Sequence, residues 1–271
     1  MSANAVEKSE NQEDTMRRFL ILGYGAICYV VFLAAFLYAI GFVGNLVVPH
    51  TVDNGIAAST AEAVAVNIVL LALFALQHSV MARPAFKQRW TRLVPTTIER
   101  STYVLLASLL LFLVFWQWRT MPATIWHVSW PPAKLALQVL FWLGWIVVLS
   151  STFMINHFDL FGLRQVYLAA RERPYTNIKF RTTLLYRLVR HPLMLGFLVA
   201  FWATPTMSAG HLLFAVMTTG YIVMALPIEE HDLSRALGEE YRQYRDRVPM
   251  LIPGLRPRRR RFTVDSGPQP T

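Results

Sequence analysis

Side chains able to bind a charged ligand gather at two points that lie far apart in the sequence. Arg190, His191 and Pro192 begin one apolar run, and Glu229 with Glu230 ends the next. If the two runs form a helical hairpin, these ends lie side by side. Proline at a helix start loses no hydrogen bond, and the N–H groups there attract a carboxylate. A ligand with both a carboxylate and cationic groups suits this arrangement, and a structural Arg–Glu clamp is the alternative.

A second polar segment, residues 156–165, follows the fourth apolar run and contains His157 and Asp159. A histidine close to a carboxylate is a familiar acid/base combination, able to orient a small substrate or hold its proton. The alternative is a turn at the membrane interface in which Asp159 pairs with Arg164. The sequence leaves both interpretations open, because only geometry distinguishes them.

A third polar group is divided between two apolar runs. His78 and Arg83 stand at the end of the second run, and Glu99 and Arg100 stand at the start of the third. Ionisable side chains at the edge of a membrane span indicate function by default. A network of hydrogen bonds that fixes helix packing explains the same residues.

The elements that position these residues are membrane-spanning helices. The chain has 271 residues, of which 55% are hydrophobic and only 15% charged, and its mean hydropathy is +0.38. Soluble domains carry about a quarter charged residues, and a span needs about 20 apolar ones. Without strand signals, this predicts an all-α polytopic bundle of five or six spans, the fifth run being short. The apolar runs cover residues 19–43, 61–76, 103–118, 134–153, 192–205 and 211–227.

Basic residues orient these spans. Arginine and lysine are concentrated before the first run, between the second and third, between the fourth and fifth, and in the C-terminal tail. Cytoplasmic loops carry such an excess, so both termini are expected in the cytoplasm, beside membrane lipid. The net charge of +10 therefore indicates membrane orientation, and nucleic acid is not an expected partner. All three polar groups fall on the cytoplasmic side.

The segment after the sixth run, residues 226–248, has the pattern of an amphipathic helix. Leu233, Leu237, Tyr241, Tyr244 and Val248 recur at helical spacing and share one face. Proline 249 follows and ends the pattern. We expect this helix to leave the sixth span on the cytoplasmic side and to cap whatever binds there.

The remaining sequence sets the domain limits. Residues 1–18 and 256–271 are predicted to be disordered tails, and residues 19–255 a single membrane domain. The only cysteine, Cys28, lies in the first apolar run. One cysteine forms no intramolecular disulfide and no cysteine-based metal site, so no metal is predicted. No obligate protein partner is predicted.

The polar residues of the C-terminal half resemble a known pattern. Arg-His-Pro at 190–192 with Gly196, the Glu pair at 229–230, and Tyr-x-x-Tyr at 241–244 before a proline resemble isoprenylcysteine carboxyl methyltransferases and phospholipid methyltransferases. The resemblance covers about residues 178–250 and implies a membrane enzyme that uses S-adenosylmethionine.

Upstream segments narrow the resemblance. Residues 77–84, 99–103 and 156–165 are similar to those of bacterial methanethiol S-methyltransferases, whose N-terminal half is NnrU-like. This similarity extends from about residue 19 and implies methylation of methanethiol to dimethyl sulfide. A prenylated or lipid substrate is the alternative within enzymes. A non-enzymatic NnrU-like membrane protein is the alternative outside them.

The resemblance to the carboxyl methyltransferases also implies a cofactor site. Matching positions give the following candidates, with the choice between the two glutamates left open: Tyr186, Arg190, His191, Pro192, Leu193, Met194, Glu229, Glu230, Tyr241 and Tyr244. Met194 departs from the tyrosine that is common at its position, so an aromatic wall of the adenosine pocket has to come from elsewhere.

The substrate, a small apolar thiol, has to lose a proton before or during transfer. The hypothesis is that His157 or Asp159, with His78 or Arg83, binds or deprotonates it near the membrane face. The reaction itself depends mainly on orientation and exclusion of water.

Overall fold

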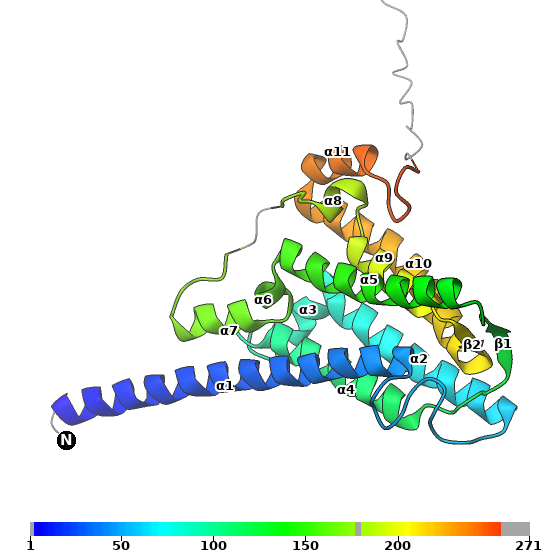
Figure 1. The fold of residues 1–271 in the computed structure, drawn as a ribbon. Helices are drawn as coiled ribbons and strands as arrows, with labels where there is room; N and C mark the ends of the chain where they lie inside the picture. The colour runs from blue at the N-terminus through cyan, green and yellow to red at the C-terminus, as the bar shows by residue number, and fades with distance from the viewer. Residues whose placement is uncertain (1–2, 177–179, 256–271) are drawn as a thin grey trace, which may run out of the picture.

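The computed structural model describes residues 3–176 and 180–255, and within them the chain is mainly helical (Figure 1). Five long helices form the body of the molecule: α1 (Ala3–Gly44), α2 (Thr60–Ala82), α4 (Glu99–Gln117), α5 (Pro131–Ile155) and α10 (Ala209–Leu237). Shorter helices lie between and after them: α3 (Pro84–Trp90), α6 (His157–Leu160), α7 (Leu163–Ala170), α8 (Leu185–Leu188), α9 (Pro192–Trp202) and α11 (Glu239–Arg247).

These five long helices are apolar enough to cross a membrane, which makes the chain an integral membrane protein and confirms the predicted all-α bundle. Large apolar side chains point outward along them, as at Phe19, Ile27 and Val223. In a bilayer this surface faces lipid. The sixth apolar run lies within α10. The fifth run forms α9, an apolar helix of 11 residues, which is shorter than the five helices that can cross a membrane.

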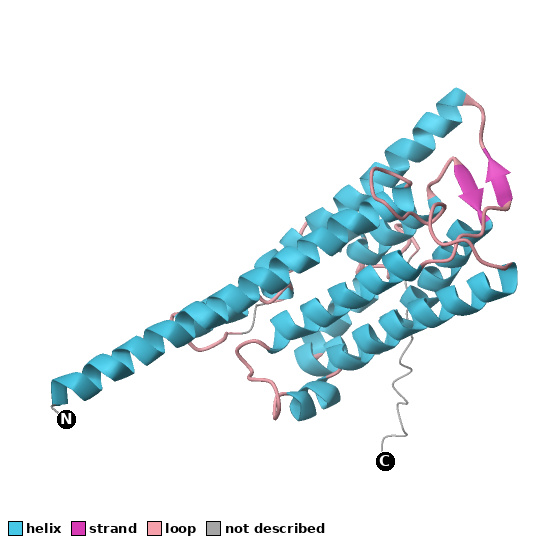
Figure 2. Cartoon of the chain, turned by 90° about the horizontal axis from the view of Figure 1, so that it is seen from below, coloured by secondary structure: helices cyan, strands magenta, loops and turns pink. Residues whose placement is uncertain are grey.

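The N-terminal segment differs from the prediction of a disordered tail, since α1 begins at Ala3 and continues without a break to Gly44. The segment before the apolar run contains neither glycine nor proline and is rich in glutamate and other helix formers. A helix already nucleated in the bilayer extends through such residues at little cost. Figure 2 shows this end of α1 projecting beyond the bundle. The C-terminal tail, residues 256–271, lies outside the described residues.

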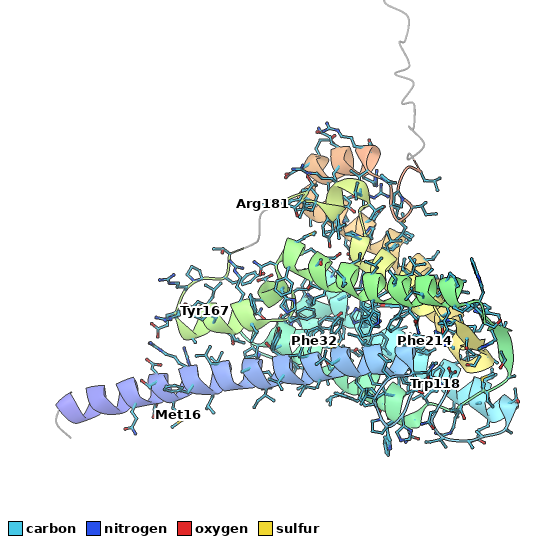
Figure 3. All side chains as sticks on the ribbon, in the orientation of Figure 1. Met16, Phe32, Trp118, Tyr167, Arg181 and Phe214 are labelled. Carbon is cyan, nitrogen blue, oxygen red and sulfur yellow. The ribbon has the colours of Figure 1, made fainter. Side chains whose placement is uncertain are left out.

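An aromatic core fills the end of the bundle away from this projection. Phe42 and Phe214 meet Trp118 edge to face, and the Trp118 indole donates to the Val52 carbonyl at 3.0 Å. Trp118 and Phe214 lie inside the bundle in Figure 3, whereas Met16 lies on the projecting part of α1. Such contacts hold α1, α4 and α10 together at this end.

Helices α5 and α9 pack closely enough for their backbones to touch. A methyl group added at Gly144 would meet the Gly196 carbonyl oxygen at 2.7 Å, and one added at Gly196 would meet the Gly144 carbonyl at the same distance. Small residues permit such close approach of helices in membranes. Gly196 therefore fixes α9, and with it the Arg-His-Pro segment at its start, against α5.

Two short strands, β1 (Thr124–His127) and β2 (Thr206–Ser208), pair antiparallel beside the aromatic core. Strands were not expected from the sequence. They lie in the loops between spans, where the pairing satisfies backbone groups that no helix engages. Figure 2 shows them at the end of the molecule opposite the N-terminus.

The amphipathic segment after the sixth span is divided between two helices. Helix α10 continues through Pro227 to Leu237, and the break comes at Gly238, whose φ is +64°. Glycine adopts this left-handed backbone without strain, so the chain turns there into α11. Helix α11 ends at Arg247, just before Pro249, as expected from the sequence.

Candidate functional site

Several polar helix ends meet at the end of the bundle opposite the two strands. They are the last turn of α2, the first turn of α4, the start of α9 and the last turns of α10, with α8 and α11 beyond them (Figure 1). The three polar groups found in the sequence all lie at this end.

The first group forms the hairpin-end cluster, which consists of the buried Arg190, His191 and Glu230 and the partly exposed Glu229. Arg190 Nε donates to Glu230 Oε1 at 2.6 Å, and His191 Nε2 lies 3.1 Å from the same oxygen. Both carboxylates thus reach the start of α9, as the hairpin hypothesis predicts. The Arg–Glu clamp that the sequence left open as an alternative is present between Arg190 and Glu230.

Arg190 is also bound to the chain that follows α11. Its Nη1 donates to the carbonyls of Arg245 and Val248 at 2.6 and 2.8 Å. The backbone N–H groups of Arg190 and His191 donate to the carbonyls of Pro249 and Met250. These two N–H groups, expected from the sequence to be available to a ligand, are therefore occupied by protein.

Free donors remain one turn further along α9. The first bond within this helix runs from Leu195 N to His191 O at 3.0 Å. Pro192 has no N–H, so the helix-start donors without an intrahelical acceptor are those of Leu193 and Met194. Pro192 is buried, and Leu193 and Met194 are half-buried.

The two glutamates have different environments. The Glu230 side chain is 8% exposed and engaged by Arg190, whereas the Glu229 side chain is 42% exposed and lies 4.0 Å from His191 Nδ1. The negative charge of Glu229 acts on four tyrosines: Tyr103, Tyr186, Tyr221 and Tyr241. Glu229 is therefore the more accessible of the two carboxylates.

Helix α11 adjoins this cluster and carries two tyrosines. Tyr244 donates to the Tyr186 carbonyl at 2.6 Å, and Phe180 packs edge-on against both α11 rings. The Tyr241 hydroxyl is buried, with no hydrogen-bond partner among the described residues. Burial raises the pKa of Tyr241, and the charge of Glu230 raises it further. Burial likewise raises the pKa of Tyr244, to about 12. Both phenols are therefore neutral donors at physiological pH.

The second group forms the Asp159 cluster, in which every carboxylate oxygen is engaged. Arg100 Nη1 lies 2.5 Å from Asp159 Oδ2, and Arg164 Nη1 lies 3.1 Å from Oδ1. The Tyr175 hydroxyl donates to Oδ2 at 3.0 Å, and both guanidinium groups lie near its ring. The cluster joins α4 to α6, α7 and the chain after α7. The ion pair with Arg164 is the one that the sequence left open.

His157, next to that cluster, has both ring nitrogens occupied. Thr152 Oγ1 donates to the Leu149 carbonyl, so its oxygen can only accept from His157 Nδ1, 2.8 Å away. Tyr29 Oη lies 2.8 Å from Nε2 and is the donor to it. The ring is therefore the neutral Nδ1–H tautomer, and burial lowers its pKa.

The third group is divided in the structure: Arg100 belongs to the Asp159 cluster and Glu99 lies near Lys87, whereas the end of α2, with His78 and Arg83, faces α10. The Tyr103 hydroxyl lies 2.9 Å from His78 Nδ1, and the Ser79 hydroxyl donates to the Tyr221 hydroxyl at 3.1 Å. Arg83 Nη1 lies 2.9 Å from Asp232 Oδ2. The end of α2 thus contacts α10, the helix that also carries Glu229 and Glu230.

Tyr103 and Tyr221 were missed as site residues from the sequence. Each had a signal in helical spacing: Tyr103 follows Glu99 by one turn, and Tyr221 precedes Glu229 by about two turns. Both tyrosines therefore share a face with an acidic residue.

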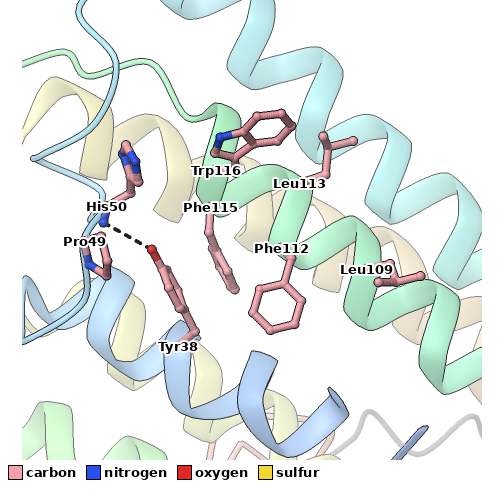
Figure 4. A pocket seen from close by; sticks show the side chains of 8 residues that line it. All are labelled: Tyr38, Pro49, His50, Leu109, Phe112, Leu113, Phe115 and Trp116. Carbon is pink, nitrogen blue, oxygen red and sulfur yellow. Dashed lines mark hydrogen bonds between the residues drawn. The ribbon is translucent and has the colours of Figure 1, made fainter. Parts of the chain in front are cut away.

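Pockets among the described residues include one at each end of the bundle. One, of about 450 Å³, lies between α1 and α4 near the core end and is lined by Tyr38, His50 and apolar side chains (Figure 4). His50 N donates to the Tyr38 hydroxyl at 3.1 Å, and no charged group lines this pocket. The other, of about 600 Å³, lies beside α8 and α11 and is polar. Only the second lies near the clustered polar residues.

The comparison with protein families defines the class of the chain. The family model described as NnrU protein matches residues 66–240, well over half of the chain. The chain therefore belongs to the NnrU family, and its fold is that of a helical integral membrane protein. No solved structure matches it.

Individual relatives are more specific. The chain is 66% identical over 238 residues to methanethiol S-methyltransferase of Mycobacterium tuberculosis, which covers 88% of this chain and 98% of that protein. It is 56% identical over 243 residues to methanethiol S-methyltransferase 2 of Bradyrhizobium diazoefficiens, covering 90% and 93%. Nurim of Mus musculus is 32% identical over 191 residues, covering 67% and 70%. The resemblance seen in the sequence is confirmed.

Proposed function

We propose that this protein is a membrane methyltransferase that methylates methanethiol to dimethyl sulfide with S-adenosylmethionine as donor. The observation that carries the proposal is the similarity to methanethiol S-methyltransferases along almost their whole length. The donor supplies a methyl group on a positively charged sulfur, and the thiol proton leaves to a base.

The hairpin-end cluster fits the amino-acid end of this donor. Its ammonium group suits the Glu229 carboxylate, which is 42% exposed and lies 4.0 Å from His191 Nδ1, too far for a hydrogen bond. Its carboxylate suits the helix-start N–H groups of Leu193 and Met194. The buried, unpartnered Tyr241 hydroxyl supports a ligand here, because buried polar groups rarely lack a partner. We assign Arg190 and Glu230 a positioning role, since Arg190 is bound by Glu230 and by two backbone carbonyls, and Glu230 Oε1 is bound by Arg190 and His191.

Tyr186, His191, Pro192 and Tyr244 form the walls of the proposed cofactor site. Tyr244 bound to the Tyr186 carbonyl holds α11 over the start of α9, which excludes water from a charged ligand. His191 stands between the two carboxylates and keeps Glu229 aimed at the site.

For the thiol we propose the third group, with His78 as proton acceptor and Tyr103 as its orienting partner. Arg83 fixes the end of α2 against α10 through Asp232. His157 and Asp159 are assigned positioning roles, because their nitrogens and oxygens already have protein partners. The site end of the bundle, and with it both termini, is proposed to face the cytoplasm, where the polar donor is made.

The test is an assay of the purified protein in detergent with isotope-labelled S-adenosylmethionine and methanethiol. Labelled dimethyl sulfide in the headspace supports the proposal. If label is transferred only to added prenylated or lipid acceptors, the substrate is one of these acceptors and not methanethiol. A folded protein that binds no donor by calorimetry would favour a non-enzymatic role.

The site assignment needs its own comparison within the same assay. His78→Gln is expected to lower kcat for the thiol at neutral pH, with donor affinity unchanged. His157→Gln is expected to leave kcat within about twofold, since it acts only through packing. If His157→Gln lowers kcat more than His78→Gln does, His157 is the proton acceptor.

A further inference from the structure

The polar pocket of about 600 Å³ beside α8 and α11 adjoins the proposed cofactor site, with which it shares Tyr244, and its other lining residues do not belong to that site. Figure 3 shows Arg181, one of its residues, next to these helices. Three arginines line it, one from each of three segments: Arg181 before α8, Arg187 on α8 and Arg247 at the end of α11. Glu240 is the single acidic residue that lines it. The pocket therefore has a net positive lining.

The positive charge is not neutralised inside the protein. Within residues 3–176 and 180–255, none of the three arginines forms an ion pair. Arg187 Nε donates to the Thr182 carbonyl at 3.3 Å, which turns its side chain toward the pocket wall. The Thr183 hydroxyl, also in the lining, is buried and has no hydrogen-bond partner within the described part of the chain. Guanidinium groups with a free hydroxyl are the donor set that binds phosphate oxygens.

Apolar side chains at the rim indicate the source of the phosphate. Leu184 and Leu188 flank Arg187 and are 71% and 58% exposed. Leu188 precedes the apolar helix α9 by only a few residues. Exposed leucines next to cationic side chains at the start of a membrane helix are typical of the boundary between headgroups and acyl chains. A water-soluble phosphate would gain nothing from them.

We propose that this pocket binds the phosphate group of an anionic phospholipid, with the acyl chains along Leu184 and Leu188. The phosphate then joins Arg187 on α8 to Arg247 on α11. These two helices also carry Tyr186 and Tyr244, whose hydrogen bond closes α11 over the hairpin-end cluster. The bound lipid therefore stabilises the position of α11 over the hairpin-end cluster. Lipid binding here does not depend on the proposed methyl transfer.

The experiment is native mass spectrometry of the full-length protein in a neutral detergent, titrated with phosphatidylglycerol or phosphatidylcholine. Wild-type protein is expected to retain phosphatidylglycerol in preference to phosphatidylcholine. The double variant Arg187→Gln/Arg247→Gln is expected to bind phosphatidylglycerol about thirtyfold more weakly, taking the usual contribution of two arginines at an anionic surface.

A matched control removes the same charge elsewhere. Arg89→Gln/Arg92→Gln changes two exposed arginines at the end of α3, outside the pocket, and is expected to alter phosphatidylglycerol binding by less than about twofold. Arg187→Lys, which keeps the charge, guards against misfolding and is expected to retain most of the affinity.

Three results would overturn the proposal. The first is equal binding of the two lipids by wild type, and the second is equal loss in the pocket and control double variants. The third is displacement of phosphatidylglycerol by millimolar inorganic phosphate, which would make the pocket a site for free anions. Each of these results is a measurement of lipid binding. Absence of methyl transfer therefore does not contradict the lipid site.

Discussion

The hairpin-end cluster and the Asp159 cluster contain the same residue types, and the structure uses them differently. Each pairs arginine with carboxylate, has histidine and tyrosine in it or beside it, and lies at the same end of the bundle. Around Asp159, two guanidinium groups and a phenol occupy both carboxylate oxygens. In the hairpin-end cluster, Arg190 and His191 engage one oxygen of Glu230, and among the described residues the Glu229 carboxylate and the Tyr241 hydroxyl have no hydrogen-bond partner.

The difference shows how a binding site is distinguished from a structural clamp of the same composition. A charge whose partners are all protein groups contributes to packing, and removing it leaves those partners buried and unpaired. A buried polar group that has no protein partner remains able to form a hydrogen bond with a ligand. The comparison therefore separates residues expected to affect stability from those expected to affect donor binding.

The largest expected effect is on stability, from Asp159→Asn. The substitution leaves Arg100 and Arg164 without their carboxylate, at a cost of about 3 kcal/mol in free energy of unfolding. We expect a lower melting temperature in detergent with the methyl-donor affinity of the surviving folded protein unchanged. Loss of donor affinity with unaltered melting would reverse the roles of the two clusters.

The next effect is on binding, from Glu229→Gln. Loss of a charge-assisted contact to the donor's ammonium group is expected to weaken binding about 100-fold in calorimetry, with little change in melting temperature. Glu230→Gln is the matched variant, because it removes the adjacent charge. It is expected to lower melting temperature first, since the buried Arg190 loses its partner. If the two variants change donor affinity and melting temperature equally, Glu229 and Glu230 do not have the different roles proposed here.

A smaller effect concerns pH. Burial lowers the pKa of His157, so the unfolded chain binds more protons than the folded one around and below the ordinary pKa of 6.5. Stability is therefore fully present above that value and falls as the pH drops through it, by up to about 1.4 kcal/mol per unit. Melting curves of wild type and His157→Gln between pH 7.5 and 5 measure the difference. Parallel slopes would contradict the burial of a neutral ring.

The smallest effect is expected from Tyr241→Phe. Removing a buried hydroxyl without a partner should raise the free energy of unfolding slightly, by less than about 1 kcal/mol. If that hydroxyl contacts the donor, affinity should fall by about fivefold. Tyr244→Phe, which breaks a hydrogen bond that is present, should instead lower stability. If Tyr241→Phe lowers stability and leaves the affinity for the methyl donor unchanged, Tyr241 does not contact the donor.

Hydropathy and charge were sufficient to predict the all-α membrane bundle and the meeting of Arg190 with Glu230, because both follow from local sequence patterns. The helical start of the chain and the two strands were missed. Residues 3–18 are polar, so only continuity with the first span makes them helical. The strands form because Thr124 and Ser208, which are distant in the sequence, lie side by side.

The sequence by itself determined the family, the chemistry of the polar residues and the end of the bundle at which they lie, since these depend on residue type and spacing. Only the tertiary structure distinguished Glu229 from Glu230 and showed that Asp159 and His157 are saturated. It also showed that the N–H groups of Arg190 and His191 are bound to the chain after α11. The physical reason is that a polar side chain is available to a ligand only when no neighbour satisfies it, and those neighbours come from distant segments.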